Sequence, residues 1–348
     1  MNPVRIALIG AGLIGREHAA LIAADPRTDL VGIADLAPGA RDLAASLGTA
    51  LHEDYVAMLD AVAPDAAIVA LPNALHVDAG LACVARRIPV LVEKPIADRV
   101  PDAMRLVHAG EGAGVPILVG HHRRHAPDIQ AAHQAIHRGD LGPLVAVSGH
   151  CVVRKHERYF DADWRRRPGG GPLLINAIHD VDCLRHLCGE IEAVQAFGSR
   201  AARGFEVEDT VAVALAFANG ALGTFLLTDA APSPWFWETA SEQALYFPGE
   251  PADAYLIAGR HASLAVPSLS LWTHDRDGDW RDPLVRRRLR AARASCYAAQ
   301  LGNLVNVVRG QAQPVVSGRE GALTLAATLA IATAIAEKRT VRVAELLA

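Results

Sequence analysis

The first 120 residues alternate short, mostly apolar runs with segments in which apolar residues recur at helical spacing. The apolar runs are Val4–Ile9, Leu30–Ala34, Ala66–Leu71, Val90–Glu93 and Ile117–Gly120. Helical patterns separate them at 13–24, 38–47, 53–62, 74–86 and 98–113. Strands that are apolar on both faces and separated by helices form a parallel sheet with both faces covered. The pattern predicts an α/β fold that begins with a doubly wound Rossmann domain over residues 1–120.

The pattern changes after residue 120. Strand patterns follow at 143–153, 191–200, 211–218, 221–228 and 262–272, and helical patterns at 126–138, 173–187, 293–309 and 319–337. Consecutive strand patterns with helices grouped around them are typical of an α+β domain. We therefore expect residues 121–348 to form a substrate-binding and oligomerisation domain with a mainly antiparallel open sheet.

Two alternating strand patterns flank Asn219-Gly220, a pair typical of a two-residue hairpin turn. Such a turn would pair Phe217 with Leu222 and Val213 with Leu226 on one face. The opposite face would carry Ala214, Ala216, Phe225 and Leu227. Antiparallel sheets usually leave one face polar, whereas both faces here are apolar. We expect helices to cover one face and a second subunit to cover the other, in a homodimer or homotetramer.

Composition narrows the function classes. The chain has 348 residues, 51% of them hydrophobic, and a net charge of −4, so nothing favours binding to nucleic acid or to a membrane surface. We expect no secretory signal before Val4, and the charge-free run Gly321–Ala336 is shorter than the roughly 20 residues of a membrane span. The 5 cysteines form no C-x-x-C pair, which favours a reducing, cytoplasmic location.

A complete G-x-G-x-x-G motif, Gly10-Ala11-Gly12-Leu13-Ile14-Gly15, joins the first strand to the first helix. In this context the glycines allow a tight turn, a close approach of a pyrophosphate, and helix–strand packing. Asp35 ends the next strand, at the distance where a carboxylate binds ribose hydroxyls and repels a 2′-phosphate. The motif predicts NAD and disfavours NADP, while a flavin or a turn without ligand remains an alternative.

Further motifs stand at the ends of the predicted strands. They are Leu71-Pro72-Asn73-Ala74-Leu75-His76, Glu93-Lys94-Pro95, Gly120-His121-His122-Arg123-Arg124, and Gly169-Gly170-Gly171 before a helix with His179 and Asp182. In this combination the whole chain resembles the Gfo/Idh/MocA family of nucleotide-dependent oxidoreductases. The resemblance implies a substrate cleft between the domains, Lys94 and His179 beside the nicotinamide, and oligomerisation through the open sheet face. The cofactor-binding residues that we predict are Gly10, Gly12, Leu13, Ile14, Gly15, Asp35, Leu71, Pro72, Asn73, His76, Glu93 and Lys94.

The chemistry of Lys94 and His179 agrees with these positions. Oxidation of a secondary alcohol needs a group that polarises the hydroxyl oxygen and a group that takes its proton. A lysine supplies the first and a histidine the second. A surface ion pair of Lys94 with Glu93, and a buried structural role of His179, are the alternatives.

The predicted helix at 173–187 carries a polar stripe that we expect to face a wet cleft. The stripe consists of Asn176, His179, Asp180 and Cys183. Family members often carry an aspartate four residues before the histidine, where this chain has Ile175. A carboxylate relay is therefore missing, and we expect Asn176 and Arg123 to position the substrate.

Other clusters are assigned more ordinary roles. His133 and His137 lack the glutamate of a zinc-protease motif, and no metal site is expected. The basic run Arg286–Arg293 is interpreted as a solvated helix. One or more of Arg123, Arg124 and Arg165–Arg167 could meet a substrate carboxylate, and structural ion pairs are the alternative. The segment Trp235-Phe236-Trp237 is interpreted as a loop over the cleft or an interface.

The sequence therefore predicts an NAD-dependent enzyme that transfers a hydride between nicotinamide and a secondary hydroxyl of a sugar, polyol or cyclic diol. Two alternatives remain. One is a glycosidase that uses bound NAD transiently without net redox change, and the other is a non-catalytic dinucleotide-sensing protein.

Overall fold

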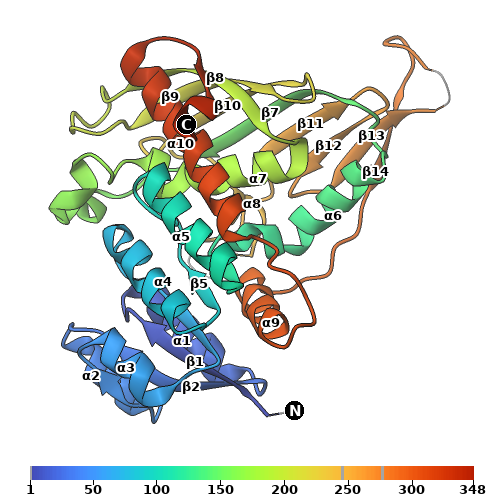
Figure 1. Ribbon diagram of the computed structural model, residues 1–348. Helices are drawn as coiled ribbons and strands as arrows, with labels where there is room; N and C mark the ends of the chain where they lie inside the picture. Colours follow the sequence, from blue (N-terminus) through green and yellow to red (C-terminus); the bar gives the residue numbers. More distant parts are fainter. Residues whose placement is uncertain (1, 244–246, 276–277) are drawn as a thin grey trace. The chain divides into compact units, whose positions relative to one another are not determined.

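The computed structural model describes residues 2–243, 247–275 and 278–348 (Figure 1). Its contacts divide the chain into two compact units. Unit 1 consists of Met1–His125 and Cys296–Leu325, and unit 2 of Ala126–Ser295 and Ala326–Ala348. The sequence pattern places residues 296–325 in the second domain, whereas their contacts group them with unit 1.

Unit 1 is built on a parallel sheet of six strands in the order β3-β2-β1-β4-β5-β6. The strands are β1 Val4–Ile9, β2 Thr28–Ala34, β3 Leu51–His52, β4 Ala66–Val69, β5 Val90–Val92 and β6 Ile117–Val119. The helices between them are α1 Leu13–Ala24, α2 Gly39–Ser46, α3 Tyr55–Val62, α4 His76–Ala85 and α5 Val100–Ala113. This arrangement confirms the doubly wound prediction.

Local signals set several helix ends in unit 1. Asp54 accepts hydrogen bonds from the amides of Val56 and Ala57, which caps α3. Helix α5 has a proline in its first turn and ends at Gly114, whose φ of 66° suits a glycine.

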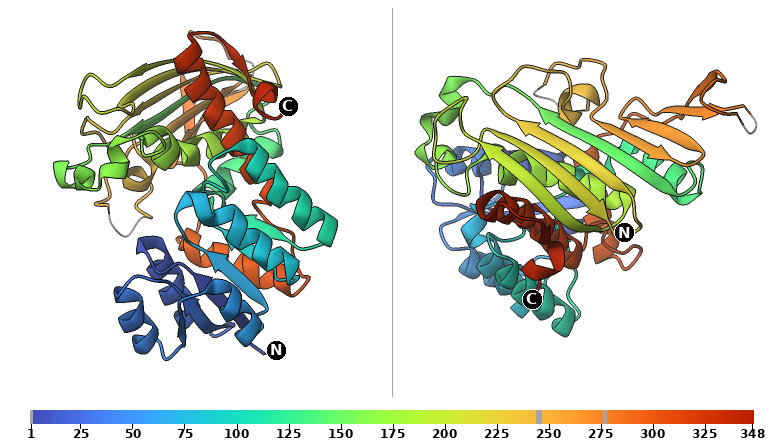
Figure 2. Two further views of the ribbon diagram at one scale, coloured as in Figure 1. Left: turned by 60° about the vertical axis from the view of Figure 1, so that its left-hand side comes forward. Right: turned by 90° about the horizontal axis from the view of Figure 1, so that it is seen from above.

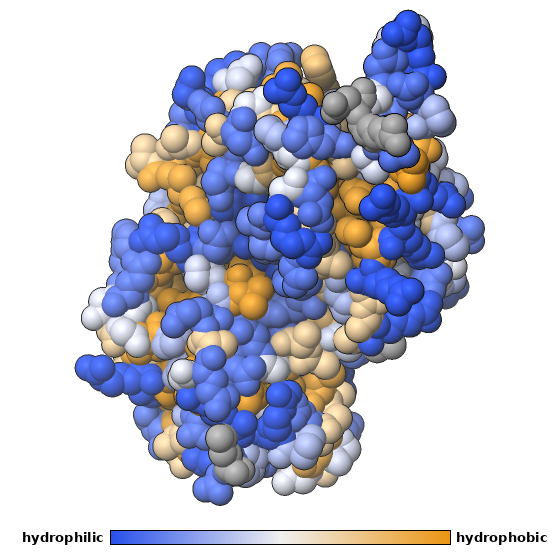
Figure 3. Space-filling view, turned by 90° about the vertical axis from the view of Figure 1, so that its right-hand side faces the viewer, coloured by the Kyte–Doolittle hydropathy of each residue, from blue (hydrophilic) through white to orange (hydrophobic). Residues whose placement is uncertain are grey.

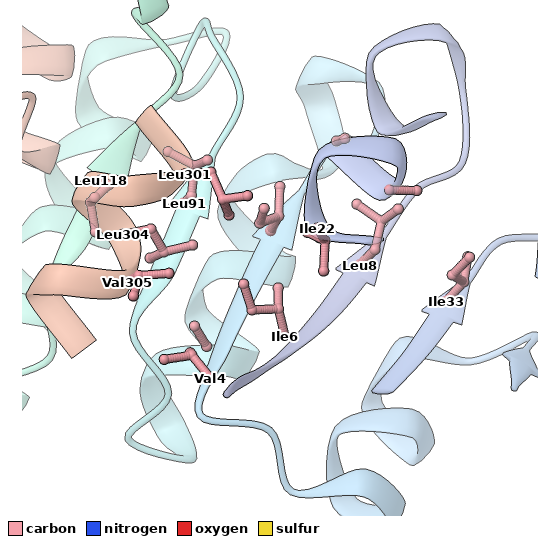
Figure 4. Packing of buried hydrophobic residues seen from close by; sticks show 14 of the residues in the cluster. Val4, Ile6, Leu8, Ile22, Ile33, Leu91, Leu118, Leu301, Leu304 and Val305 are labelled. Carbon is pink, nitrogen blue, oxygen red and sulfur yellow. The ribbon is translucent and has the colours of Figure 1, made fainter. Parts of the chain in front are cut away.

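The core of unit 1 lies between the sheet and its helices (Figure 4). Ile6, Leu8 and Ile33 have no exposed surface. Helix α9 (Cys296–Val308) comes from far along the chain and adds Leu301, Leu304 and Val305 to this cluster. Burial of these apolar side chains explains why α9 groups with unit 1.

Unit 2 is built on a nine-stranded sheet in the order β14-β13-β12-β11-β7-β10-β9-β8-β15. The strands are β7 Leu144–Val152, β8 Ile191–Ser199, β9 Thr210–Phe217, β10 Leu222–Thr228, β11 Tyr255–Gly259, β12 Ala262–Val266, β13 Ser270–His274, β14 Leu284–Arg288 and β15 Val341–Arg342. The helices that begin outside unit 1 are α6 Pro127–His137, α7 Ile178–Cys188 and α8 Trp237–Ala240. Strands β7 and β10 are parallel, and the other described pairs of this sheet are antiparallel, as predicted.

Two predicted elements of this region are wrong. The pattern at 262–272 is not one strand, because Val266-Pro267 separates β12 from β13 and proline cannot donate a ladder hydrogen bond. The basic run is not a helix at its start, since Arg286, Arg287 and Arg288 belong to the edge strand β14. Exposed arginines suit an edge strand because their charge opposes edge-to-edge pairing.

The predicted register of the β9–β10 hairpin is also wrong. Leu222 pairs with Ala216 and Phe225 with Val213, because the loop has three residues, 218–220, and ends at Gly220 with φ of 88°. Three-residue loops with a left-handed last residue are a common hairpin type. A shift of one position exchanges the faces. The buried face therefore carries Val211, Val213, Leu215, Phe217, Phe225 and Leu227.

The opposite face of this sheet is open and apolar. It carries Phe197, Leu222, Leu226 and Leu256, which expose 77%, 63%, 38% and 46% of their surface. In the view from above, the strands lie in front of α6 and α7 (Figure 2). A hollow of about 930 Å³ on this face is lined by residues that include Leu222, Leu256 and Trp272.

Helix α10 (Gly318–Glu337) is the described helix that is long and apolar enough to cross a membrane, with a mean hydropathy of 1.3. Of its most apolar 18-residue stretch, 56% is buried inside the protein, as in the core helix of a soluble protein.

The surface on the side of the molecule seen in Figure 3 is mixed. Apolar residues form separate patches among hydrophilic ones there, as on an ordinary water-facing surface.

Candidate active site

The glycine-rich loop between β1 and α1 is shaped for a dinucleotide. Gly10 has φ of 100°, and a Cβ there would lie 2.4 Å from the carbonyl oxygen of Ala70. A Cβ on Gly15 would lie 2.1 Å from the carbonyl oxygen of Gly10. A Cβ on Gly12 would meet nothing within 4 Å, so the space beside it is open. Gly10 and Gly15 permit the packing of the loop, and Gly12 faces the space that a pyrophosphate would fill.

The start of α1 suits the phosphates of a dinucleotide. No side chain caps its N-terminus among the residues that the structure describes. The amides of the first turn and the helix dipole therefore favour an anion. The residues of this loop fit NAD on both counts.

Asp35 ends β2 beside this loop. Its two carboxylate oxygens accept hydrogen bonds from the amides of Ala11 and Ala37, both at 2.6 Å. These bonds fix a negative charge next to the glycine-rich loop, where it would repel a 2′-phosphate. Leu13 and Leu36 expose 79% and 80% of their surface at the same place. Exposed leucines beside the loop suit the apolar faces of a bound dinucleotide.

The loop after β4 contains the predicted cofactor residues Leu71, Pro72, Asn73 and His76. His76 is 1% exposed, and its ring nitrogens lie 2.7 Å from the carbonyl oxygens of Leu71 and Pro95. His76 therefore ties the 71–76 loop to the loop that carries Lys94.

Lys94 follows β5 and precedes Pro95 through a cis peptide bond. The preceding Glu93 is 6% exposed, and its carboxylate accepts from His18 Nε2 at 2.8 Å and from the Lys94 amide at 3.2 Å. A Cβ on Gly120 would lie 2.7 Å from this carboxylate. Burial raises the pKa of Glu93, but the hydrogen bond from His18 and the charges of His18 and Lys94 outweigh burial and hold it below its ordinary value. Glu93 thus anchors the Lys94 backbone from inside the unit.

Sequence reasoning missed His18. It stands in the middle of α1, and nothing in the local pattern distinguishes it from other buried helix residues. The spatial adjacency of α1 and the end of β5 alone reveals its role.

The residues after β6 are packed inside unit 1. His122 stacks on Tyr297 of α9, with ring centroids 4.2 Å apart, and Arg124 pairs with Glu320 at 2.9 Å. Arg123 is 1% exposed. Burial, together with the charges of Arg123 and Lys94, lowers the pKa of His122 well below its ordinary value, so this ring is neutral at pH 7.

The helix that carries His179 begins with an irregular turn. Leu173–Ala177 is a π-helical segment, and α7 continues from Ile178. A π-turn adds a residue and rotates the positions before it relative to those after it. Regular i, i+3 spacing therefore does not extend from Asn176 into α7.

The predicted polar stripe is accordingly divided. Asp180 is fully buried and accepts a hydrogen bond from the Tyr255 hydroxyl at 2.5 Å, and Cys183 is also fully buried. Both residues pack inside unit 2, so they do not face a wet cleft. Ile175 and Asn176 are half-buried, and His179 is 7% exposed.

Lys155 is a neighbour of Asn176 that sequence reasoning missed. Its Nζ donates to Asn176 Oδ1 at 2.6 Å and lies 3.5 Å from Asp229 Oδ2. Arg203 Nε lies 3.1 Å from the other oxygen of the same carboxylate. Lys155 and Asp229 follow β7 and β10, the parallel pair whose ends Val152 and Thr228 are partners. The sequence offers no motif for this cluster, since its members are far apart in the chain.

The residues that the structure describes contain no candidate metal site. No group of three or more His, Cys, Asp or Glu side chains among the described residues could hold a metal ion. The predicted catalytic residues are carried by different compact units, Lys94 by unit 1 and His179 by unit 2.

Comparison with known proteins identifies the relatives of this chain. Residues 4–121 match the model described as "Oxidoreductase family, NAD-binding Rossmann fold", and residues 129–263 match the "GFO/IDH/MocA C-terminal domain". The match to an NAD-binding Rossmann family confirms the cofactor prediction.

Curated relatives match over most of the chain. The chain is 31% identical over 277 residues to 1,5-anhydro-D-fructose reductase of Ensifer adhaerens, covering 78% of each protein. It is 25% identical to myo-inositol 2-dehydrogenase of Thermotoga maritima, covering 99% of this chain and 100% of that protein. Matches to other relatives cover as little as 54% of the relative's length.

A solved structure is similar over nearly the full length. The WlbA dehydrogenase from Bordetella pertussis, crystallised in complex with NADH and UDP-GlcNAcA, matches with a TM-score of 0.80 and 26% identity. The match covers 98% of this chain and 99% of that chain.

Proposed function

The chain belongs to the Gfo/Idh/MocA family of oxidoreductases, and from this premise we propose that it is an NAD-dependent dehydrogenase of a secondary hydroxyl in a sugar, polyol or cyclic diol. The observation that carries the proposal is the position of Lys94. It lies at the carboxyl end of a parallel strand, where doubly wound sheets bind ligands. Its backbone is held by the buried Glu93 and His18.

Each residue receives one role. Gly10, Gly12 and Gly15 with Asp35 hold the dinucleotide. Lys94 binds the hydroxyl oxygen and stabilises the negative charge that develops on it. His179 takes the hydroxyl proton, and Asn176 positions the substrate. Arg123 is 1% exposed, so its burial inside unit 1 does not suit the predicted contact with the substrate. NAD supplies the acceptor for the hydride that leaves the carbinol carbon.

The test is Lys94→Ala, assayed with NAD and a panel of sugars, inositols and dihydrodiols. Loss of a positioned electrostatic and acid–base group should lower kcat at least ~100-fold, while NAD still binds. Lys338→Ala, at an exposed position, is the matched control. Turnover of Lys94→Ala close to that of the unaltered protein would refute the role.

The same assay separates the alternatives. Glycoside cleavage without net NADH formation would identify the non-redox glycosidase. Dinucleotide binding without any turnover would identify a sensor. Ile175 keeps the sensor alternative in the test, because the family resemblance implies an aspartate at this place.

We also propose that the protein is a cytoplasmic homo-oligomer. Phe197, Leu222, Leu226 and Leu256 form an exposed apolar face that a second copy would cover. All 5 cysteines are free thiols, which suits a reducing compartment. Sedimentation at micromolar concentration tests the assembly, and a monomeric mass would overturn it.

A further inference from the structure

The side chains around Asn176 form a binding site rich in donors. The carbonyl oxygen of Asn176 accepts from Lys155, so the remaining polar group of this side chain is its NH2, which donates. The ammonium of Lys155 also donates only. The side chain of Ile175, the neighbour of Asn176, contributes no acceptor. A substrate group bound here must therefore supply acceptor oxygens.

The charge of this cluster favours an anion. The Lys155 side chain is 11% exposed, and the Asp229 side chain beside it is 2% exposed. The Asp229 carboxylate pairs with two cations. Arg203 Nε lies 3.1 Å from one of its oxygens, and Lys155 Nζ lies 3.5 Å from the other. The closer pair is with Arg203, which also donates to the backbone oxygens of Asp229 and Lys155. Arg203 also contacts Glu157 Oε1 at 3.4 Å, and the Lys155 ammonium has the longer of the two contacts with Asp229. A negatively charged substrate group would therefore add a charge-assisted contact to Lys155.

A second carboxyl, Glu208, lies in the same region. It accepts from the Leu173 amide at 3.0 Å, at the start of the irregular turn. Burial, with a smaller contribution from the charge of Asp229, raises the pKa of Glu208, and the hydrogen bond from the Leu173 amide and the charge of Lys155 oppose this only in part. The Glu208 carboxyl is thus engaged by the backbone of the irregular turn, and burial disfavours its charged form.

The Lys155 side chain is positioned by packing as well as by charge. Its Nζ lies 4.4 Å from the centroid of the Tyr159 ring, and the Arg165 guanidinium lies 4.0 Å from the same centroid. Arg165 donates to the Tyr159 carbonyl oxygen at 2.6 Å. A cation held by a ring, an amide and a carboxylate loses little freedom when it binds a ligand.

We propose that the substrate is a sugar acid, and that Lys155 and Asn176 bind its carboxylate. The inference rests on the proposed function, because it places the substrate at the start of the helix that carries His179. An ammonium and an amide NH2 match the two oxygens of a carboxylate through charge-assisted hydrogen bonds. A neutral polyol presents hydroxyl groups whose protons find no acceptor on these two side chains.

The experiment compares acids with neutral sugars of the same ring: D-glucuronate with D-glucose, and D-galacturonate with D-galactose. We measure kcat/KM with NAD, and binding to the NADH-loaded protein by nicotinamide fluorescence. The kcat/KM of the unaltered protein should be at least ~10-fold higher for an acid than for the matching neutral sugar. Lys155→Met should lose this preference because its KM for the acid rises. Lys155→Arg should retain most of it. Arg158→Met, which removes an exposed charge three positions away, should retain all of it.

Each outcome decides between the two proposals. Equal use of acid and neutral sugar, or a preference that survives Lys155→Met, overturns the sugar-acid proposal and leaves the dehydrogenase intact. Binding of an acid that depends on Lys155 without any turnover supports the sugar acid and contradicts the dehydrogenase. Absence of acid binding overturns the sugar-acid proposal. Melting temperatures of both Lys155 variants show whether the fold is kept, and Lys155→Arg decides the result if Lys155→Met does not fold.

Discussion

The two sheets of this protein bury their strands in different ways. In the parallel sheet of unit 1, β4 and β5 are buried along their whole length, and β1 is buried at every position except Arg5. In the sheet of unit 2, β9 and β10 alternate buried with exposed residues, and the exposed face is still apolar. Other parts of the same chain cover the apolar surface of the first sheet, whereas one apolar face of the second sheet stays uncovered. The candidate functional residues of the two units also differ in their origin. In unit 1 they belong to short motifs at strand ends, whereas in unit 2 they form a cluster of residues that are distant in the chain.

The largest contrast should appear in the cores. Leu8→Ala, at a fully buried position of β1, should lower the free energy of unfolding by about 2–5 kcal/mol, since it removes packed atoms and leaves a cavity. Leu226→Ala, at a position 38% exposed on β10, is the matched control and should cost less than about 1 kcal/mol. Chemical denaturation measures both values. Equal losses would contradict the difference between the sheets.

The next effect concerns the buried pair behind Lys94. His18→Leu should cost about 3 kcal/mol at pH 7, because Glu93 loses a hydrogen-bonded partner in a buried place. The pKa of Glu93 is lowered in the folded protein, so its contribution is present above the ordinary value of 4.5 and is lost as the pH falls through the folded pKa. The cost of His18→Leu should therefore shrink on acidification. His108→Leu, at an exposed position, should show no such change.

A smaller effect separates the glycines of the nucleotide loop. Gly12→Ala should weaken NAD binding about tenfold, which corresponds to about 1.4 kcal/mol, and leave the melting temperature unchanged. The reason is that its Cβ would enter the open space of the loop and not the protein. Gly15→Ala should instead destabilise unit 1, because its Cβ would lie 2.1 Å from the Gly10 carbonyl oxygen. NAD titration and thermal melts separate the two, and a destabilised Gly12→Ala would contradict this assignment.

The smallest effect on the fold should come from the open face. Leu226→Glu should change the free energy of unfolding of the protomer by less than about 0.5 kcal/mol. It should nevertheless weaken self-association, because a charge would be buried in the proposed subunit contact. Sedimentation of the variant beside Thr224→Ser, a mild change on the same face, tests this. An unchanged oligomer would show that copies meet elsewhere.

Much of unit 1 could be predicted because its signals are local. Buried parallel strands are continuous apolar runs, and the glycine motif lies within six residues of one loop. The return of α9 to this unit could not be predicted, since the residues that recruit it, Leu301, Leu304 and Val305, resemble those of any buried helix. His18 was missed for the same reason.

Unit 2 was less readable because its decisive features depend on small changes in geometry. One additional loop residue at 218–220 shifts the pairing of β10 against β9 by one position. The side chains of β10 on the buried face are therefore the ones predicted for the opposite face. One π-turn at Leu173–Ala177 separates Asn176 from the spacing of α7, in which Asp180 and Cys183 are fully buried.

The sequence by itself determined the doubly wound NAD-binding domain, its nucleotide loop, and the positions of Asp35 and Lys94 at strand ends. These properties follow from contiguous residues and from the fixed periods of strands and helices. The tertiary structure alone decided that His18 and Glu93 anchor Lys94, that one face of the second sheet remains apolar and open, and that Lys155 reaches Asn176. Such contacts join residues distant in the chain, and their distances depend on the packing of whole elements.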